Sequence, residues 1–257
     1  MALTFYKYQG TGNDFIMIDN RDNLFPKSDI KLVASLCDRR FGIGADGLIL
    51  LENDNVSDFK MIYYNSDGNP SSMCGNGGRC LVAFAKYLEI IERTASFNAV
   101  DGLHNATIEN EMVSLQMQNV SEIKEKSKYV FLDTGSPHHI QLVENLQDFN
   151  VPREGAKLRY GLYGEKGSNI NFVEPKEDIF FVRTYERGVE DETFSCGTGV
   201  TAVALAMHNI GKTNADMITI KTPGGTLNVS FNKNGEGYEN IHLIGPAKQV
   251  FKGEIPW

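Results

Sequence analysis

Cys74-Gly75-Asn76-Gly77-Gly78 and Cys196-Gly197-Thr198-Gly199 each stand directly before an apolar stretch with helical spacing. The first is followed by Leu81 to Leu88 and the second by Val200 to His208. The second stretch is apolar on nearly every face, which predicts a helix buried on all sides rather than one lying on a surface. We therefore expect Cys74 and Cys196 at the starts of two helices.

The two halves of the chain repeat each other at a nearly constant offset, with Cys196 placed 122 positions after Cys74 (196 − 74 = 122). A strand, a turn, a Cys-Gly-x-Gly and a helix recur in the same order, which indicates a duplicated α/β unit. Two copies related by a pseudo-twofold axis would face equivalent helix ends towards a shared cleft. The same offset takes Phe59 to Phe181, Tyr63 to Tyr185, Gly42 to Gly164, Gly75 to Gly197, Gly77 to Gly199 and Gly102 to Gly224, and one residue more takes Thr11-Gly12-Asn13 to Thr134-Gly135-Ser136.

Strand and helix patterns alternate along the rest of the chain. Stretches rich in β-branched and aromatic residues predict strands at 3–8, 59–64, 179–185 and 227–231. Helical spacing over 28–40 predicts a helix that Ser28 caps. The chain has no low-complexity segment and no long Pro/Ser linker, so both halves are expected to fold.

Composition and charge limit the classes of function. The 257 residues are 41% hydrophobic and 23% charged, which is enough to bury one large core or two smaller ones. A net charge of −8 without any Lys/Arg block argues against nucleic acid or an anionic membrane as partner and favours a small molecule. No apolar run approaches the ~18 residues of a membrane span, and Met1 to Phe15 lacks a secretory pattern, so we expect a cytoplasmic protein.

Cysteine usage points to reduced thiols. Four cysteines are too few for a disulfide scaffold, and their positions lack the paired C-x-x-C spacing of a metal site. Cys37 and Cys80 fall on apolar helix faces and are expected to be inert. The repeat singles out Cys74 and Cys196 as the reactive pair.

The Cys-Gly-x-Gly sequence suits an anion. Glycines let the chain turn into the helix and leave the N–H groups of its first turn open, and these donors act together with the positive end of the helix dipole. The anion can be the thiolate of the cysteine itself or a substrate carboxylate held by the same amides.

Two thiols on opposite sides of one cleft fit inversion at a carbon that bears a proton. A thiolate removes the proton from one face while a thiol delivers another proton to the opposite face. The Cα of an amino acid is a very weak carbon acid, so such a site must exclude water and surround the carboxylate with donors. The sequence therefore predicts an amino-acid epimerase that needs no cofactor.

Eight short strings lie in a fixed order along almost the whole chain, and together they resemble the diaminopimelate epimerase family. The resemblance implies interconversion of LL- and meso-2,6-diaminopimelate, in lysine and peptidoglycan precursor synthesis, without pyridoxal phosphate or a metal. It also implies two domains, 1–117 and 118–245, each a mixed β-sheet around a central helix, with the tail 246–257 returning to the first domain and the active site in the cleft between them. The strings are GNDF (12–15), FGIGADG (41–47), YNSDG (64–68), MCGNGGRC (73–80), SPHH (136–139), NINFVE (169–174), RTYERG (183–188) and SCGTG (195–199).

The resemblance also implies a role for each matching residue. Cys74 and Cys196 would be the proton donor and acceptor, exchanging roles with the direction of reaction. His138 and Glu186 would tune the thiols, and Glu186 and Arg187 would also bind the amino and carboxylate groups of the substrate. The remaining substrate ligands would be the side chains of Asn13, Asn65 and Asn169 and the backbone amides of Gly75, Asn76, Gly197 and Thr198.

Two departures limit this transfer, and a third position bears on the oligomeric state. Ser136 stands where the family commonly has Asn, and its shorter side chain reaches the substrate directly or only through a water. Gly47 falls where some members carry Gln and is not counted as a ligand. Phe251 resembles an aromatic dimer contact, which suggests a homodimer, with a buried core Phe as the equal alternative.

Three other functions fit parts of the sequence. Proline racemase and hydroxyproline epimerase share the logic of two cysteines but usually place His where this chain has Asn76, so the CGNG string favours diaminopimelate. A redox pair of Cys74 and Cys196 lacks the C-x-x-C spacing. A calcium-binding module at Asp54 to Asp58 lacks the central Gly and the terminal Glu of such a loop.

Overall fold

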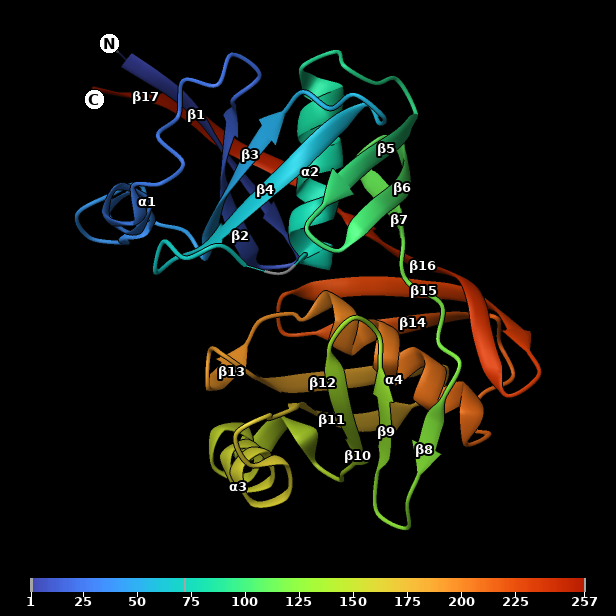
Figure 1. The fold of residues 1–257 in the computed structure, drawn as a ribbon. Helices are drawn as coiled ribbons and strands as arrows, with labels where there is room; N and C mark the ends of the chain where they lie inside the picture. Colours follow the sequence, from blue (N-terminus) through green and yellow to red (C-terminus); the bar gives the residue numbers. More distant parts are fainter. Residues whose placement is uncertain (1, 72, 257) are drawn as a thin grey trace. The chain divides into compact units, whose positions relative to one another are not determined.

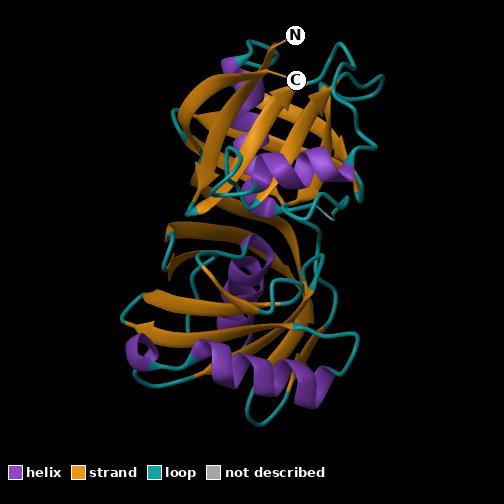
Figure 2. Ribbon diagram, turned by 90° about the vertical axis from the view of Figure 1, so that its left-hand side faces the viewer, coloured by secondary structure: helices purple, strands orange, loops and turns teal. Residues whose placement is uncertain are grey.

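The computed structural model describes residues 2–71 and 73–256. The chain divides into two compact units, unit 1 formed by Met1–Leu115 with Gly245–Trp257 and unit 2 formed by Gln116–Ile244. In each unit, strands surround one long helix, drawn as α2 and α4 (Figures 1 and 2). Within the described ranges, no helix is both long and apolar enough to cross a membrane.

Unit 1 is a mixed sheet around α2. Strand β1 pairs antiparallel with both β17 and β2, so the two ends of the chain lie side by side (Figure 1). Strand β2 is parallel to β3, and β4 is parallel to β5, whereas the β3–β4, β5–β6 and β6–β7 pairs are antiparallel. The elements are β1 (Ala2–Gly10), β2 (Asn13–Asp19), α1 (Ile30–Cys37), β3 (Gly47–Glu52), β4 (Phe59–Asn65), α2 (Gly75–Tyr87), β5 (Thr94–Ala99), β6 (Gly102–Glu109), β7 (Met112–Gln116) and β17 (Lys248–Pro256).

Unit 2 repeats this arrangement around α4. Strand β10 is parallel to β11 and β12 is parallel to β14, whereas the β9–β10, β11–β12 and β14–β15 pairs are antiparallel. The elements are β8 (Ile123–Glu125), β9 (Val130–Asp133), β10 (Pro137–Leu142), the 3₁₀ helix η1 (Leu146–Asp148), α3 (Val151–Tyr163), β11 (Asn169–Lys176), β12 (Ile179–Glu186), β13 (Asp191–Thr193), α4 (Gly197–Asn209), β14 (Met217–Thr222), β15 (Gly225–Asn234) and β16 (Gly237–Pro246). The predicted fold, two duplicated domains with a mixed sheet around a central helix, is confirmed.

The two central helices are close copies of each other. Each has 13 residues, and each has its cysteine as the N-cap in extended conformation, with φ −113° at Cys74 and −118° at Cys196. Helix α4 is buried at Gly197 and continuously from Gly199 to Met207, which confirms the prediction that it is covered on all sides. An apolar run of this kind is stable only inside a sheet, because exposing any face would leave apolar area in water.

The strand registers refine the repeat. Leu48 pairs with Tyr64 and Ile170 with Tyr185, so the counterpart of Tyr185 is Tyr64, at an offset of 121, and not Tyr63. By the same register Phe59 corresponds to Phe180, and both rings are buried. Ala99 pairs with Gly102 and Thr222 with Gly225, which makes Gly225, and not Gly224, the counterpart of Gly102. Single-residue differences in the loops therefore shift the offset between 121 and 123.

The outer helices differ from the sequence predictions. Helix α1 is capped by Asp29, whose carboxylate accepts from the Leu32 amide at 3.0 Å, and not by Ser28. It ends at Cys37 instead of continuing to Arg40, because the carboxylate of Asp38 accepts from the amides of Arg40 and Phe41 in a competing turn. Helix α3 has no counterpart among the predictions. Its start carries the expected signals, with the Asn150 side chain accepting from the Arg153 amide and a proline in the first turn.

Candidate active site

The candidate residues of unit 1 gather at one end of its strands. Strand β2 begins at Asn13, β3 begins at Gly47, and the antiparallel β4 ends at Asn65, which pairs with Gly47. The start of α2 lies at the same end, because the thiol of Cys74 contacts the side chain of Asn13. Asn65 is exposed there, and its backbone N–H donates to the backbone carbonyl of Asn69 at 3.0 Å.

Cys74 sits beside two amide side chains. Its Sγ lies 3.6 Å from Oδ1 of Asn13, which also accepts from Nδ2 of Asn76 at 3.3 Å. The other end of the Asn13 amide donates to Asp46 at 2.6 Å. Asn13 is therefore held with its oxygen towards Cys74. Cys74 is only partly buried, whereas Gly75 and Asn76 behind it are buried.

A cluster of four charged residues, Lys7, Asp14, Arg39 and Asp46, lies next to Asn13. Asp14 accepts from Lys7 at 2.8 Å and from Arg39 at 2.7 Å, and Arg39 also reaches Asp46 at 2.7 Å. Burial alone would raise the pKa of Asp14, but the hydrogen bonds from Arg39 and Lys7 outweigh it and lower the pKa to about 2. The two positive and two negative charges of the cluster balance. The cluster therefore holds the side chain of Asn13 in place without adding a net charge beside it.

Unit 2 gathers its candidates at the equivalent end. Phe15 pairs with Gly47 in unit 1 and His138 pairs with Asn169 in unit 2, so these pairs correspond. Asn169 donates through Nδ2 to Ser136 Oγ at 2.8 Å, and its Oδ1 accepts from the Arg187 amide at 2.9 Å. Glu186, at the end of β12, accepts from the hydroxyl of Thr193 at 2.8 Å. The structure thus brings Ser136, Asn169 and Arg187 together.

A chain of hydrogen bonds leads to Cys196. Its Sγ lies 3.5 Å from the hydroxyl of Thr198, and this hydroxyl lies 3.0 Å from Nε2 of His138. Nδ1 of His138 lies 3.1 Å from Nδ2 of Asn171. The Asn171 amide is oriented by its other contacts, since Oδ1 accepts from Thr184 and Nδ2 donates to the His139 carbonyl. With Nδ1 as acceptor, Nε2 of His138 carries the proton, and the Thr198 hydroxyl is left to donate to Cys196.

His138 is neutral in this chain. It is fully buried, and burial followed by the nearby charge of Arg187 lowers its pKa to about 3. Gly199 allows helix α4 to pack closely against His138 and Asn171. A Cβ at position 199 would lie 2.6 Å from Oδ1 of Asn171 and 3.3 Å from Cε1 of His138. The glycine after Thr198 is thus required by the packing of α4 against His138 and Asn171.

The other two cysteines have the surroundings of inert thiols. Cys37 and Cys80 are buried, and burial raises the pKa of each thiol to about 12. Both therefore stay protonated near neutral pH.

Gly47 and Phe251 are also placed by the structure. A Cβ at Gly47 would lie 2.5 Å from the Tyr64 carbonyl and 2.6 Å from the ring of Tyr63, so this position has no room for a longer side chain. Phe251 packs edge-on against Phe5 with ring centroids 6.0 Å apart, yet it is 46% exposed. The alternative of a buried core Phe at this position is therefore wrong.

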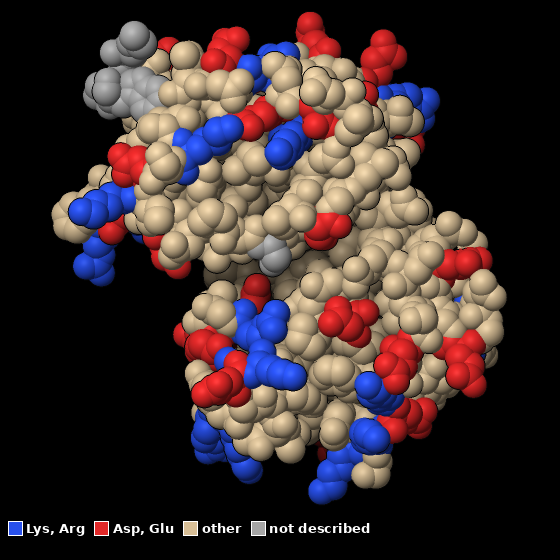
Figure 3. Space-filling model, viewed as in Figure 1, with Lys and Arg blue, Asp and Glu red and all other residues tan. Residues whose placement is uncertain are grey.

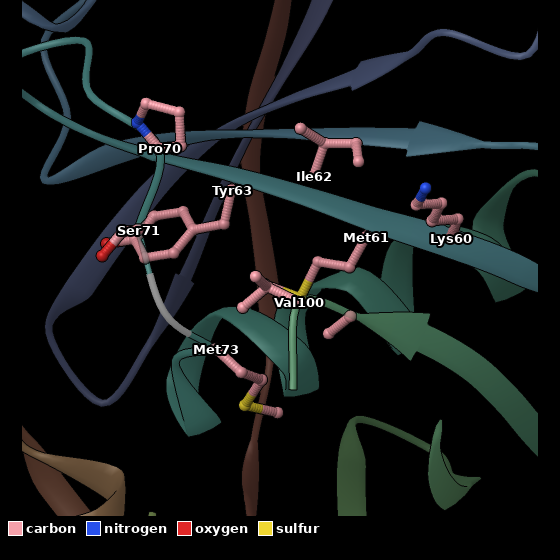
Figure 4. A pocket seen from close by; sticks show the side chains of 9 residues that line it. Lys60, Met61, Ile62, Tyr63, Pro70, Ser71, Met73 and Val100 are labelled. Atoms are coloured by element: carbon pink, nitrogen blue, oxygen red, sulfur yellow. The ribbon is translucent and has the colours of Figure 1, made fainter. Parts of the chain in front are cut away.

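Figure 4 shows a pocket of unit 1. It is lined by Met61, Tyr63, Pro70, Ser71, Met73 and Val100, which are mainly apolar (Figure 4). None of the candidate thiols, amides or carboxylates lines it.

In the calcium-like segment Asp54 to Asp58, the carboxylate of Asp54 already accepts hydrogen bonds from the side chains of Ser57 and Asn98. Among the described residues no three His, Cys, Asp or Glu side chains gather as metal ligands would.

Surface charge shows no concentration of one sign on the face drawn in Figure 3. There, acidic and basic side chains are interspersed over each unit (Figure 3). This distribution suits a small-molecule site better than a polyanion.

Sequence reasoning missed two groups of residues that the structure adds to the site. Asn171 and Thr184 orient His138, and a weak signal for Asn171 was present, since it is a polar residue in the middle of an apolar strand. Arg79 and Thr11 lie together behind the start of α2. Arg79 belongs to the MCGNGGRC string, but its burial cannot be read from the sequence.

Comparison with known proteins gives one consistent family. A family model described as Diaminopimelate epimerase matches residues 5–122 and 130–250. The diaminopimelate epimerase of Flavobacterium psychrophilum is 64% identical over 253 residues, covering 97% of this chain and 99% of its own. That of Chlorobaculum tepidum is 43% identical over 258 residues, covering 96% and 98%.

Solved structures share the fold at low sequence identity. A PhzF-family phenazine biosynthesis protein of Bacillus anthracis superposes with a TM-score of 0.81 at 15% identity, covering all of both chains. A hydroxyproline epimerase of Agrobacterium vitis gives a TM-score of 0.71 at 15% identity, covering 99% of this chain and 92% of the other. These likenesses concern the fold alone, whereas the sequence matches and the paired Cys-Gly-x-Gly helix starts agree on function. The chain belongs to the diaminopimelate epimerase family.

Proposed function

We propose that this protein is an isomerase that interconverts LL- and meso-2,6-diaminopimelate by two proton transfers between Cα and a pair of thiols. The single observation that supports this most directly is the duplicated helix start, with Cys74 and Cys196 as N-caps of matching conformation. The relatives' name supplies the substrate. Diaminopimelate carries two amino and two carboxylate groups. We propose that its epimerisation by this protein serves lysine and cell-wall precursor synthesis.

In the proposed reaction each thiol serves one face of the substrate's Cα. The thiolate of one cysteine takes the Cα proton, so that the C–H bond breaks, an S–H bond forms and the electron pair stays on the carbon, delocalised into the carboxylate. The other thiol then gives its proton to the opposite face and becomes the thiolate. The reverse reaction exchanges the two roles, and both transfers use groups of this chain.

The first-turn amides of α2 and α4 are the proposed carboxylate donors. Those of Gly75, Asn76, Gly197 and Thr198 lie at positive helix ends, where negative charge is stabilised as the carbanion develops. Asn13, Asn65, Asn169, Arg187 and Glu186 are proposed as side-chain ligands. Asn169 Nδ2 is already bonded to Ser136 Oγ, which supports an indirect role for Ser136, holding Asn169 rather than touching the substrate.

His138 and Glu186 are proposed to act on Cys196 and on the substrate ammonium respectively. His138 reaches Cys196 through the Thr198 hydroxyl, so its contribution is a neutral hydrogen-bond chain that steadies a sulfur anion. Glu186 supplies a carboxylate beside Arg187, a combination that suits a zwitterionic amino acid.

We also propose a cellular location and an oligomeric state. We place the enzyme in the cytoplasm, because its four cysteines are free thiols, as is usual for proteins of a reducing compartment. We also propose a homodimer through β17, where Val250 and Phe251 are 57% and 46% exposed. Sedimentation velocity would show the Phe251→Asp protein as a smaller species than the parent if this contact holds the dimer, and equal sedimentation would reject it.

A substrate panel tests the proposed activity. The protein is incubated without pyridoxal phosphate with LL-diaminopimelate, meso-diaminopimelate, L-proline, trans-4-hydroxy-L-proline and L-lysine, and isomers are separated by chiral chromatography. Only the two diaminopimelate isomers should interconvert. Inversion of proline or hydroxyproline at a higher kcat/KM would assign the chain to the alternative activity, and no inversion of diaminopimelate would reject the proposal.

A further inference from the structure

Arg159 is a nearly buried arginine on helix α3 that the proposed reaction does not use. Helix α3 packs against β11, β12 and β13 of unit 2 (Figure 1). Only 10% of the Arg159 side chain is exposed, although arginine is rarely buried unless it is paired. Its guanidinium contacts two loops, residues 164–167 and residues 186–190, and both of these loops hold the proposed substrate ligand Arg187.

The turn at 186–190 carries Arg187 in its sequence. It is closed by a hydrogen bond from the Glu190 amide to the Glu186 carbonyl at 2.8 Å. The carboxylate of Glu190 folds back into the turn and accepts from the Gly188 amide at 3.2 Å. Glu190 has a φ of 58°, a left-handed conformation that is uncommon for a residue other than glycine or asparagine. Its side chain therefore stabilises a turn that its backbone alone would not favour.

Arg159 anchors this carboxylate to α3. Nε and Nη2 of Arg159 lie 3.2 and 3.1 Å from Oε1 of Glu190, and Oε2 accepts from the hydroxyl of Tyr185 at 3.3 Å. Burial would raise the pKa of Glu190, but the hydrogen bonds from the Gly188 amide and from Arg159 outweigh it and lower the pKa. Glu190 is therefore ionised at neutral pH, and the pair is held by charge as well as by hydrogen bonds.

Arg159 also holds the loop between α3 and β11. Its Nη1 donates to the carbonyl of Gly164. The backbone of Gly167 lies directly against the guanidinium, since a Cβ there would be 2.5 Å from Cζ of Arg159. Lys166, between these two glycines, accepts through its carbonyl from Nη1 of Arg187 at 3.1 Å. The carbonyl that binds the Arg187 side chain is thus fixed by Arg159.

Arg187 is held at its backbone and at its side chain. Its amide donates to Oδ1 of Asn169 at 2.9 Å, and its guanidinium donates to the Lys166 carbonyl. A guanidinium has five N–H donors, so the bond to Lys166 leaves others for a carboxylate. The direction in which those donors point depends on the two loops that Arg159 holds together.

We propose that Arg159 and Glu190 are positioning residues, which together orient the guanidinium of Arg187 for the carboxylate of an amino-acid substrate. The inference rests on the proposed function, in which Arg187 is a substrate ligand, and deepens it by assigning a role to helix α3. Neither Arg159 nor Glu190 touches the substrate. Breaking their ion pair releases the turn at 186–190 and leaves the helix that begins after Cys196 in place.

Hydrogen–deuterium exchange followed by mass spectrometry tests this inference without substrate. In Arg159→Met, peptides that cover 164–167 and 186–190 should exchange faster than in the parent, because the amides of Gly188 and Glu190 lie in a turn that has lost its anchor. Glu190→Gln, which removes the charge and keeps the size of the side chain, should accelerate exchange in the same peptides. Peptides of α4 should exchange at the parental rate in both variants.

Turnover of diaminopimelate gives the second readout. Arg159→Met should lower kcat/KM by about 10- to 100-fold, as expected when a binding group is displaced by about 1 Å. In an Arg187→Ala background the same substitution should cause little further loss, because no guanidinium is left to position. A role in stability alone would make the two losses multiply. Arg153→Met is the matched control on α3, because Arg153 is 74% exposed and pairs only with its neighbour Glu154, and it should leave exchange and turnover at parental values.

Exchange at 186–190 that is unchanged in both Arg159→Met and Glu190→Gln would overturn the inference. So would losses of kcat/KM from Arg159→Met and Arg187→Ala that multiply in full in the double variant. If the parent protein does not invert diaminopimelate, the proposed function fails, whereas faster exchange of the turn in the two variants still supports the ion pair as the anchor of Arg187. The failure of this inference is therefore distinguishable from failure of the proposed function.

Discussion

Nδ1 of His138 accepts a hydrogen bond from Nδ2 of Asn171 at 3.1 Å, and this contact fixes which nitrogen of the imidazole carries its proton. The proton must then be on Nε2, where it is donated to the Thr198 hydroxyl 3.0 Å away. Asn171 thus controls the direction of every hydrogen bond between itself and Cys196. Because all members are buried or partly buried, each change along the chain leaves a polar group without its partner.

Replacing Asn171 by Leu removes this control while keeping the volume of the side chain. Three buried partners lose a hydrogen bond, namely Nδ1 of His138, the His139 carbonyl and the Thr184 hydroxyl. We expect the free energy of unfolding to fall by about 1–3 kcal/mol for each group left unpaired, and kcat to fall as well. Urea denaturation and steady-state rates check this. Asn232→Leu, at an exposed position of β15, should change neither, and an Asn171→Leu protein with parental stability would contradict the assigned network.

The two buried histidines predict how stability depends on pH. Burial lowers the pKa of His138 to about 3 and that of His139 to about 4, both from 6.5. Below pH 6.5 the unfolded chain therefore takes up protons that the folded chain resists, so the free energy of unfolding falls as the pH drops from 6.5 towards 4. The slope approaches about 1.4 kcal/mol per pH unit for each histidine.

Chemical denaturation of the parent, His138→Gln and His139→Gln at intervals from pH 7 to 4 measures this slope. Each variant should show a shallower slope than the parent. The stabilising contribution of Asp14, with a pKa lowered to about 2 from 3.8, is lost only below this window. Equal slopes in all three proteins would mean that neither histidine is held neutral by the fold.

Gly199 and Gly161 form a matched pair of helix glycines. A methyl group at Gly199 would lie 2.6 Å from Asn171 Oδ1, whereas at Gly161 nothing lies within 4 Å. Gly199→Ala should therefore lower both stability and kcat, since α4 must move away from His138. Gly161→Ala should raise stability by about 1 kcal/mol, because alanine has the higher helix propensity. Thermal melts and rates of both variants decide this, and a fully active Gly199→Ala would contradict the packing described for α4.

The sequence predicts the central part of each unit well, because that part depends on local signals. Cys-Gly-x-Gly before an apolar run locates the starts of α2 and α4, and β-branched runs locate β1, β4, β12 and β15. The end of α1 was misplaced because the Asp38 side chain competes with the helix for backbone amides, a balance that helical periodicity does not contain. The one-residue error at Tyr63 arose because the register of a hairpin is set by both strands together.

The residues of the candidate site also fall into two groups, those with a local sequence signal and those without one. Residues that carry recognisable chemistry, such as Cys74, Cys196 and Arg187, can be found from motifs. Residues that act through packing cannot, because Asn171 and Arg159 owe their importance to burial beside another side chain. Burial of that kind depends on contacts between strands and helices far apart in the chain.

Removing either thiol tests whether both are needed. Cys74→Ala and Cys196→Ala should each lower kcat by ~10²–10⁴, the usual loss for one general acid or base. Cys37→Ala should retain near-parental activity, because this thiol is buried and its raised pKa keeps it protonated. Circular dichroism of all three proteins should match that of the parent. Near-full turnover by either of the first two variants would contradict the mechanism.

The central claim is that two thiols act on opposite faces of Cα, and hydrogen exchange with solvent tests it most directly. If Cys74 and Cys196 serve different faces, the proton removed by one cannot be the proton delivered by the other. Thiol protons equilibrate with water before the substrate binds, so the delivered hydrogen comes from solvent. The measurement is the reaction of LL-diaminopimelate in deuterium oxide, stopped at low conversion, with mass spectrometry of each separated isomer. Two thiols predict that the meso product carries deuterium from the first turnover while the remaining LL isomer stays mostly protiated, and early meso product that is largely undeuterated would contradict the account.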